Sequence, residues 1–340
     1  MVLEGNAGSV WAVAFHRDGK HFFNGTYNEI RRWRVADGQE LGKLETGMEV
    51  FAISVSKDHK WVACGTTSGA SIWDPELREK AAEVESGKVV WSVDVAPDCT
   101  RFATGTLSGQ VTIWSITTGE KLAGLLEFGN YVNGVKFSPD GGRLATACYN
   151  DSTLRIFDAH NGDHLISIEN AVFSDSLLPI AWSTHGQQLF AVSRDYYKIK
   201  SFDSSTGSPL AEWQIHENNN GPMSIALSAN GKFIASSAGR FVSFWDTLTH
   251  THLGIIEETH QIQSIALSPN GCRLATGSTD LGTSIILNLG GILPDSYLLG
   301  NVSIPFLQST MTFIHKSLFM HARKFLVPEC KYRIILHSEQ

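Results

Sequence analysis

The sequence lacks the cysteine pairs from which many small metal sites and disulfide frameworks are built. Its five cysteines are an odd number, and none of them stands in a C-x-x-C motif. Cysteine-type zinc sites need paired ligands at short spacing, so the sequence predicts no metal site. We expect small buried hydrophobic side chains in a reducing compartment instead. The cysteines are Cys64, Cys99, Cys148, Cys272 and Cys330.

Long apolar runs are lacking too. No segment approaches the roughly 20 apolar residues that a helix needs to span a bilayer. The first residues, MVLEGNAGSV, have neither the charged start nor the apolar centre of a signal peptide. The sequence therefore predicts a cytoplasmic protein without a membrane partner. The sequons at Asn24, Asn150 and Asn301 are expected to stay unglycosylated.

The sequence has fewer basic than acidic residues. The chain has 27 Lys and Arg against 34 Asp and Glu, a net charge of −7. Nucleic-acid-binding domains usually carry a basic face or stripe, so we expect no nucleic-acid partner.

The motifs of common catalytic classes are absent. There is no G-x-S-x-G nucleophile motif and no G-x-x-x-x-G-K-[ST] phosphate loop, and the sequence predicts no catalytic residue and no cofactor.

What the sequence does have is a repeat. Seven copies, each of them alternating apolar and polar residues, end on an aromatic or apolar residue at successive separations of 40, 41, 43, 45, 43 and 42 positions. Copies of this length with period-two alternation indicate a four-stranded propeller blade, not a pair of helices. The closing residues are Trp33, Trp73, Trp114, Phe157, Phe202, Trp245 and Leu287.

Turn residues divide each copy into strands. Pairs such as Asp18-Gly19 and Asn230-Gly231 predict a two-residue hairpin between the first and second strands, because these residues accept positive φ. A later Gly-containing turn, as at Asp37-Gly38, precedes a fourth strand. We therefore predict an all-β, seven-bladed propeller of four-stranded antiparallel blades over residues 1–290.

The sequence resembles the WD-repeat family, in a divergent form similar to WD-repeat tracts of fungi. The resemblance covers about residues 1 to 290. It rests on the turn Ser138-Pro139-Asp140-Gly141, the L-A-T-G segment of residues 274–277, and the W-D pairs Trp73-Asp74 and Trp245-Asp246.

The family's buried Asp-His-Ser-Trp hydrogen-bond network is expected to be broken in most blades. The Gly-His dipeptide is absent: Gly5-Asn6 stands in the first copy, and only His260 lies near such a place in the seventh. The turn aspartate survives only as Asp151.

Two segments are candidates to close the ring, a step that matters because an open propeller leaves an unpaired edge. Residues 1–3 suit an N-terminal closing strand, the one we favour, and residues 297–304 offer an alternative within a C-terminal extension, 291–340. The rest of that extension is expected to be a helix, centred on TFIHKSLFMHARKF, or an irregular or disordered tail.

The family resemblance implies a top face, formed where the inner strands begin, that binds partners. The residues carried over to it are Trp11, Glu49, Phe51, Val89, Trp91, Tyr131 and Asn133. Aromatic residues gather on blades one to four, a composition typical of interface hot spots, although packing between blades would use the same rings. Glu49, Asp195 and Asp280 suggest an acidic rim and a basic or amphipathic peptide.

These observations favour a non-catalytic scaffold that binds a protein or peptide partner. Two alternatives stay open. One is a metal-dependent propeller hydrolase of the lactonase kind, which would need several carboxylates or amides converging on the central channel. The channel-facing positions expected here offer mainly Asp94, and one carboxylate does not make a cation site. The other is a fragment of a larger WD-repeat signalling protein.

Overall fold

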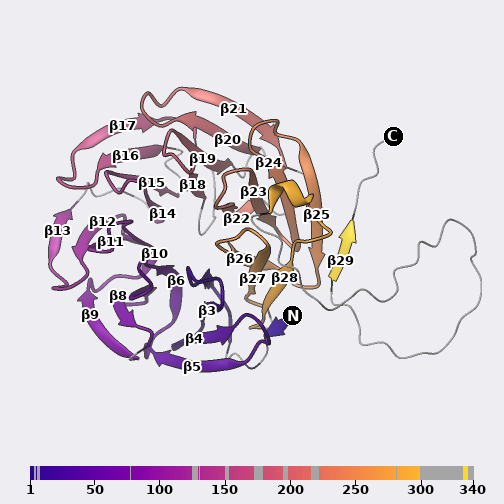
Figure 1. The fold of residues 1–340 in the computed structure, drawn as a ribbon. Coiled ribbons are helices and arrows are strands. Elements are labelled where there is room, and N and C mark those ends of the chain that lie inside the picture. The colour runs from indigo at the N-terminus through magenta and orange to yellow at the C-terminus, as the bar shows by residue number, and fades with distance from the viewer. Residues whose placement is uncertain are drawn as a thin grey trace, which may run out of the picture.

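The structure is a computed structural model. It describes residues 1–3, 5, 8–76, 78–124, 129, 131–149, 153–171, 179–192, 198–215, 224–280 and 282–298, and the backbone alone of residues 193, 222–223 and 332–335. Seven antiparallel sheets surround a central axis, as the view along the ring in Figure 1 shows. The prediction of a seven-bladed propeller with four-stranded blades is confirmed.

The strands follow the chain from the innermost to the outermost position of each blade. Blade 1 has β2 (Ala12–Phe15), β3 (His21–Gly25), β4 (Glu29–Arg34) and β5 (Glu40–Glu45). Blade 2 has β6 (Val50–Val55), β7 (Val62–Thr66), β8 (Gly69–Asp74) and β9 (Glu79–Glu85). Blade 3 has β10 (Val90–Val95), β11 (Arg101–Thr106), β12 (Val111–Ser115) and β13 (Lys121–Gly124). Blade 4 has β14 (Val132–Phe137), β15 (Arg143–Cys148), β16 (Leu154–Asp158) and β17 (His164–Ile168).

The remaining blades continue this order. Blade 5 has β18 (Ile180–Trp182), β19 (Gln188–Ser193), β20 (Lys198–Asp203) and β21 (Pro209–Gln214). Blade 6 has β22 (Pro222–Leu227), β23 (Phe233–Ala238), β24 (Phe241–Asp246) and β25 (His252–Glu258). Blade 7 has β26 (Ile262–Leu267), β27 (Arg273–Ser278) and β28 (Ser284–Asn288), and its fourth strand is β1 (Val2–Leu3).

The hydrophobic core lies between neighbouring blades. All five residues of β7 are buried, whereas the outer strand β9 is exposed at most positions. A second strand such as β7 has a blade on either side, and this explains why it is buried on both faces. One cluster joins Phe23 and Ile30 of blade 1 to Val62 and Trp73 of blade 2.

Gly277 of the L-A-T-G segment and its counterpart in blade 3, Gly105 of F-A-T-G, have a packing role. A methyl group at Gly105 would lie 2.5 Å from Cγ1 of Val132, the first residue of the next blade's inner strand. Gly277 faces Val10 in the same way across the seam between blades 7 and 1. The small residue thus lets adjacent blades approach closely.

The closing residues lie in the third strand of each blade, and the indole groups of the tryptophans among them keep part of the family's network. Trp33 Nε1 donates to Asn24 Oδ1 at 2.7 Å, and Trp114 Nε1 donates to Thr104 Oγ1 at 2.8 Å. The acceptors lie on the second strands, so these two blades retain the link from tryptophan to a second-strand polar group. Asp151 lies outside the described residues.

The N-terminal strand closes the ring. Val2 of β1 pairs with Ile285 of β28, and Leu3 pairs with Ser284. Of the alternative closing segment, Tyr297 ends a short 3₁₀ helix, Asp295–Tyr297, and residues 299–304 lie outside the described residues. N-terminal closure removes the free edge that β28 would otherwise present.

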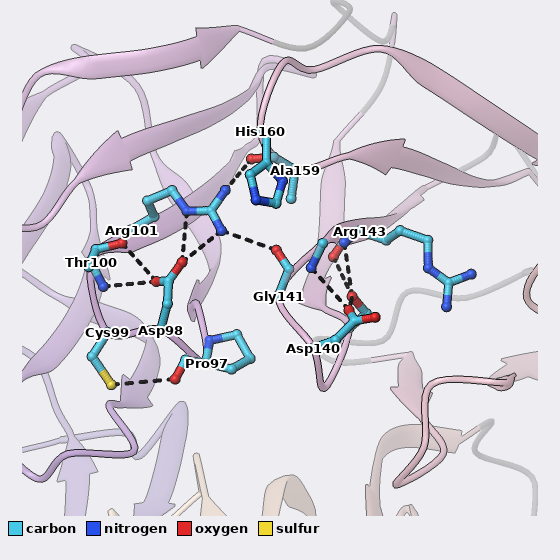
Figure 2. Close-up of polar contacts among 12 residues, drawn as sticks. Pro97, Asp98, Cys99, Thr100, Arg101, Asp140, Gly141, Arg143, Ala159 and His160 are labelled. Atoms are coloured by element: carbon cyan, nitrogen blue, oxygen red, sulfur yellow. Dashed lines mark hydrogen bonds and ion pairs between the residues drawn. The ribbon is translucent and has the colours of Figure 1, made fainter.

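The predicted two-residue hairpins are wrong in detail. The Ser138 N–H donates to Arg143 O at 2.8 Å, and the Gly141 N–H donates to Ser138 O at 2.8 Å, so four residues, 139–142, lie between the last hydrogen-bonded pair. Positive φ occurs at Gly141 (75°) and not at Asp140, whose Oδ1 instead accepts the Gly142 N–H (Figure 2). The aspartate is used for its side-chain hydrogen bonds.

Neighbouring turns are tied together by arginine side chains. Figure 2 shows the Arg101 guanidinium between Asp98 of its own turn and the Gly141 carbonyl of the next blade, with Arg101 Nη2 to Gly141 O at 3.1 Å. Arg143 reaches the Gly186 carbonyl of blade 5 at 2.7 Å.

Beyond β28 the chain packs against blade 6. Leu289 and Leu293 are buried, and the Tyr297 hydroxyl donates to Asp246 Oδ2 at 2.6 Å. The domain boundary at residue 290 stays a prediction. The helix proposed for TFIHKSLFMHARKF lies outside the described residues, while β29 (Tyr332–Ile335) pairs with β25.

Candidate functional site

A bulge recurs where inner strands begin. The register of the inner strand pair shifts between Val50 and Ala52, and again between Val90 and Ser92. Blades 4, 6 and 7 show the same shift. The extra residue is Phe51 in blade 2 and Trp91 in blade 3. A bulge changes the direction of the side chain at the extra residue. The predicted top-face residues Phe51 and Trp91 therefore stand where the regular alternation of side chains along the strand is broken.

Three of the predicted residues form one aromatic cluster. The ring centroids of Phe51 and Trp91 are 4.8 Å apart, and Trp11 lies 5.8 Å from Phe51 and 5.9 Å from Trp91. The three rings come from the starts of the inner strands of three successive blades. Trp11 Nε1 donates to Glu49 Oε1 at 2.7 Å, which fixes the orientation of that indole. We call these three rings the axial aromatic cluster.

The cluster is partly open to solvent. Phe51 is 9% exposed, whereas Trp11 and Trp91 are half-buried. Phe51 therefore serves mainly as packing between its neighbours, and the two indoles supply the accessible surface.

The other predicted residues do not join this cluster. Tyr131 is 51% exposed and stacks on Tyr149 at 5.8 Å, forming a second aromatic pair on blade 4. Asn133 is 3% exposed, so it has little surface to offer a partner. Val89 is half-buried beside the start of β10.

Two exposed apolar side chains near this face were missed by sequence reasoning. Tyr27, in the turn between β3 and β4, is 65% exposed, and Met48, just before β6, is 41% exposed. Both lie in connections at the end of the ring where inner strands begin. Their position in loops was visible in the sequence, but their exposure was not.

The expected acidic rim is described only in part. Glu49 accepts the Trp11 indole N–H, and Asp280 is exposed with Oδ2 accepting the Gln261 N–H at 3.3 Å. Asp195 lies outside the described residues.

The central channel holds a cavity of about 470 Å³ on the side away from the axial aromatic cluster. Asp94 is the one carboxylate among the described residues that line it. Its Oδ1 accepts Lys136 Nζ at 2.6 Å, and its Oδ2 accepts the Phe137 N–H at 2.9 Å. The described lining therefore lacks the converging carboxylates that a lactonase-like cation site needs.

A titratable cluster does occur on the turn of blade 1. Ligand-type atoms of His16, Asp18 and His21 all lie within 4.8 Å of one another, a grouping that occurs once in the described part of the chain. The sequence signal was H-x-D-x-x-H, which a search centred on cysteine spacing does not find.

A model of a known repeat family matches this chain. The model described as WD domain, G-beta repeat matches residues 1–34, 82–115, 124–158, 207–246 and 250–281, together about half of the chain. The chain belongs to this WD-repeat family. Propellers of the family fit a role as protein-interaction scaffolds.

A solved WD-repeat-like structure supports the fold. The β-propeller domain of Cps50 (Swd1) from Myceliophteria thermophila superposes with a TM-score of 0.74 and 17% identity, covering 83% of this chain and 96% of that one. At this identity the likeness shows the fold alone.

Curated relatives match over parts of their length. A serine-threonine kinase receptor-associated protein of Dictyostelium discoideum is 22% identical over 50% of this chain and 56% of its own. A U3 small nucleolar RNA-associated protein 15 homolog of Xenopus tropicalis is 28% identical over 44% of this chain and 28% of its own. The chain thus spans about half or less of the length of these relatives. In the residues described, no helix is long and apolar enough to cross a membrane.

Proposed function

We propose that this WD-repeat chain is a non-catalytic scaffold that binds a protein or peptide on the top face of blades 1 to 4. The observation that carries the proposal is the axial aromatic cluster, in which a Glu49 hydrogen bond orients Trp11, a bulge carries Trp91, and both indoles stay half-buried. Rigid, half-exposed tryptophans lose little entropy on binding and are enriched in interface hot spots.

The surroundings of the cluster support this proposal. Tyr27, Met48 and Tyr131 add exposed apolar surface at the same end of the ring. Most of the other exposed large apolar residues, such as Leu165, Leu210 and Leu248, are single residues on outer strands or on the opposite turns. Scattered exposed residues are normal, whereas a group around an aromatic centre marks an interaction site.

The test is affinity capture with the full chain, followed by measurement of the dissociation constant for the purified partner. Trp11→Ala and Trp91→Ala should each weaken binding by about 30-fold, the equivalent of roughly 2 kcal/mol at a hot spot. Trp61→Ala is the matched control, since Trp61 is a half-buried tryptophan at the opposite end of the ring, just before β7. Folded variants with unchanged affinity would remove the top face from the proposal.

The partner's chemistry and the setting are further parts of the proposal. Glu49 and Asp280 favour a basic or amphipathic peptide, and the net charge of −7 argues against a general nucleic-acid surface. We place the protein in the cytoplasm. A named relative associated with a small nucleolar RNA makes an RNA-binding assay the natural companion experiment. A fragment of a larger WD-repeat signalling protein stays an alternative.

A further inference from the structure

The turn between the first two strands of blade 1 differs from the same turn elsewhere in the ring. Its first, third and sixth positions are His16, Asp18 and His21. The first position in the other six blades is occupied by Ser or Ala: Ser56, Ala96, Ser138, Ser183, Ser228 and Ser268. Blade 1 alone has a histidine there.

The six other blades show what this turn needs for its structure. Ser138 Oγ donates to Asp140 and accepts the Arg143 N–H at 2.9 Å. Ser228 makes the same pair of contacts with Asn230 and the Phe233 N–H. A small hydroxyl therefore satisfies the turn, and Ala96 shows that even the hydroxyl is dispensable. The imidazole of His16 has no role that the turn itself requires.

The two imidazoles of blade 1 converge on one oxygen. Asp18 Oδ2 lies 3.0 Å from His16 Nδ1 and 2.7 Å from His21 Nδ1. Asp18 Oδ1 is held separately, because it accepts the Lys20 N–H at 2.7 Å and the His21 N–H at 3.1 Å. The backbone thus orients the carboxylate and leaves Oδ2 to the imidazoles.

His16 Nδ1 is the ring atom that faces the cluster, because it lies 3.0 Å from Asp18 Oδ2, whereas Nε2 lies 3.4 Å from the His59 carbonyl oxygen. A proton or a metal ion between Nδ1 and Oδ2 makes this approach favourable, so a bound cation would take the place of a hydrogen bond. A backbone carbonyl behind the far nitrogen is the usual outer support of a metal-binding histidine.

We propose that His16 Nδ1, Asp18 Oδ2 and His21 Nδ1 bind a divalent transition-metal ion, with Zn²⁺ as the probe ion. Two imidazoles and one carboxylate suit zinc in sites that keep a position open for water. Metal–ligand bonds of about 2.1 Å at tetrahedral angles separate ligand atoms by about 3.4 Å, so Oδ2 and the nitrogens need to move apart by roughly half an ångström.

The surroundings leave such an ion accessible. The side chain of His16 is 6% exposed, but those of His21 and Asp18 are 22% and 27% exposed, so the open side faces solvent. Glu76 adds negative charge to the surroundings: Arg32 first, and the two imidazoles after it, lower its pKa. Arg32 is itself paired with Glu76 at 2.6 Å.

The test titrates the chelator-treated full chain with Zn²⁺ by calorimetry and with Cu²⁺ by electron paramagnetic resonance, which counts bound nitrogens. The wild-type chain should bind zinc saturably at one site and show two imidazole nitrogens on copper. His16→Ser and His21→Arg should each lose one nitrogen and at least about tenfold in zinc affinity. Both changes install residues found at these positions in other blades, Ser138 and Arg143 among them, so both variants should fold.

His160→Ala is the matched control, because His160 also lies beside an aspartate, Asp158, but is 68% exposed and belongs to no such cluster among the described residues. It should keep the wild-type affinity. Three results would each overturn the proposal: no saturable zinc binding by the wild type, unchanged affinity in His16→Ser, or an equal loss in His160→Ala.

Discussion

Glu258 is a buried carboxyl at the seam between blades 6 and 7. It is 3% exposed, and its Oε1 accepts the Thr276 hydroxyl at 2.9 Å. It lies four residues before Ile262, as Asn6 lies four residues before Val10, so Glu258 and not His260 holds the place of the family's histidine. Burial raises its pKa to about 7, against the opposing effects of the Thr276 hydrogen bond and the N-terminal ammonium.

This carboxyl should make stability depend on pH. The folded chain retains a proton on Glu258 between its unfolded pKa, near 4.5, and about 7, so stability should fall as pH rises through that range and level off above it. The full loss is about 3 kcal/mol at most. Urea unfolding at a series of pH values measures it.

Glu258→Gln isolates the effect. The amide cannot ionise, so the variant should lose this pH dependence and be more stable than the wild type above neutrality. Glu257→Gln is the control, because Glu257 is the neighbouring carboxylate paired with Arg240. Parallel pH profiles for the wild type and Glu258→Gln would contradict the assignment.

The hairpin turns need a positive φ at their fourth position, and different residue types occupy that position. The fourth position of the turn has φ of 75° at Gly141 but 59° at Cys99, which has a side chain. A non-glycine residue in the left-handed region costs roughly 1–2 kcal/mol. Cys99 therefore carries backbone strain that Gly141 avoids.

Exchanging the two residue types should have opposite effects. Cys99→Gly is expected to stabilise the chain by up to about 1 kcal/mol, and Gly141→Ala to destabilise it by about 1 kcal/mol. A Cβ at Gly141 would lie 3.4 Å from Pro97 Cδ, an ordinary contact, so strain and not collision is the cause. Urea unfolding compares them, with Cys99→Ala as the control that removes the thiol but keeps the Cβ. An equal gain in Cys99→Ala would assign the effect to the thiol.

The bulges are the element that creates the candidate site. Without the bulge at Trp91, the side chains of β10 would alternate regularly between the two faces of the sheet, and the Trp91 side chain would follow that alternation. The candidate surface is thus a property of strand irregularity and not of the strand pattern itself.

At the scale of the whole ring, closure depends on a strand of two residues. Leu3 of β1 is 1% exposed and packs with Val10 and Ile286, joining the first residues of the chain to the last blade. Removing residues 1–3 should lower the unfolding midpoint and expose the edge of β28. We expect concentration-dependent association, measured by size-exclusion chromatography with light scattering.

Leu3→Ala separates the loss of Leu3 packing from the exposure of the β28 edge. The strand keeps its backbone pairing with Ser284, so this variant should lose about 2–5 kcal/mol of stability but stay monomeric when folded. A truncated chain that remained monomeric would show that β28 does not need β1 as a cover.

Blade number and strand order follow from local chemistry, which is why they could be read along the chain. Period-two alternation, turn residues and the spacing of residues such as Trp33 and Trp73 are properties of segments a few residues long. The H-x-D-x-x-H motif is equally local, and it was missed because metal spacing was sought among cysteines. The hairpin geometry was misjudged because the Asp-Gly pair suits more than one turn type.

Other features required the folded ring, because they join residues far apart in sequence. Phe51 stands 40 positions after Trp11 and 40 positions before Trp91, and only the packing of successive blades around the ring brings their rings together. The choice of β1 over residues 297–304 was likewise settled by a pairing across the whole chain. Such contacts depend on how the blades pack around a common axis. The residue pattern of one blade determines its own strands and turns but not how it packs against the other blades.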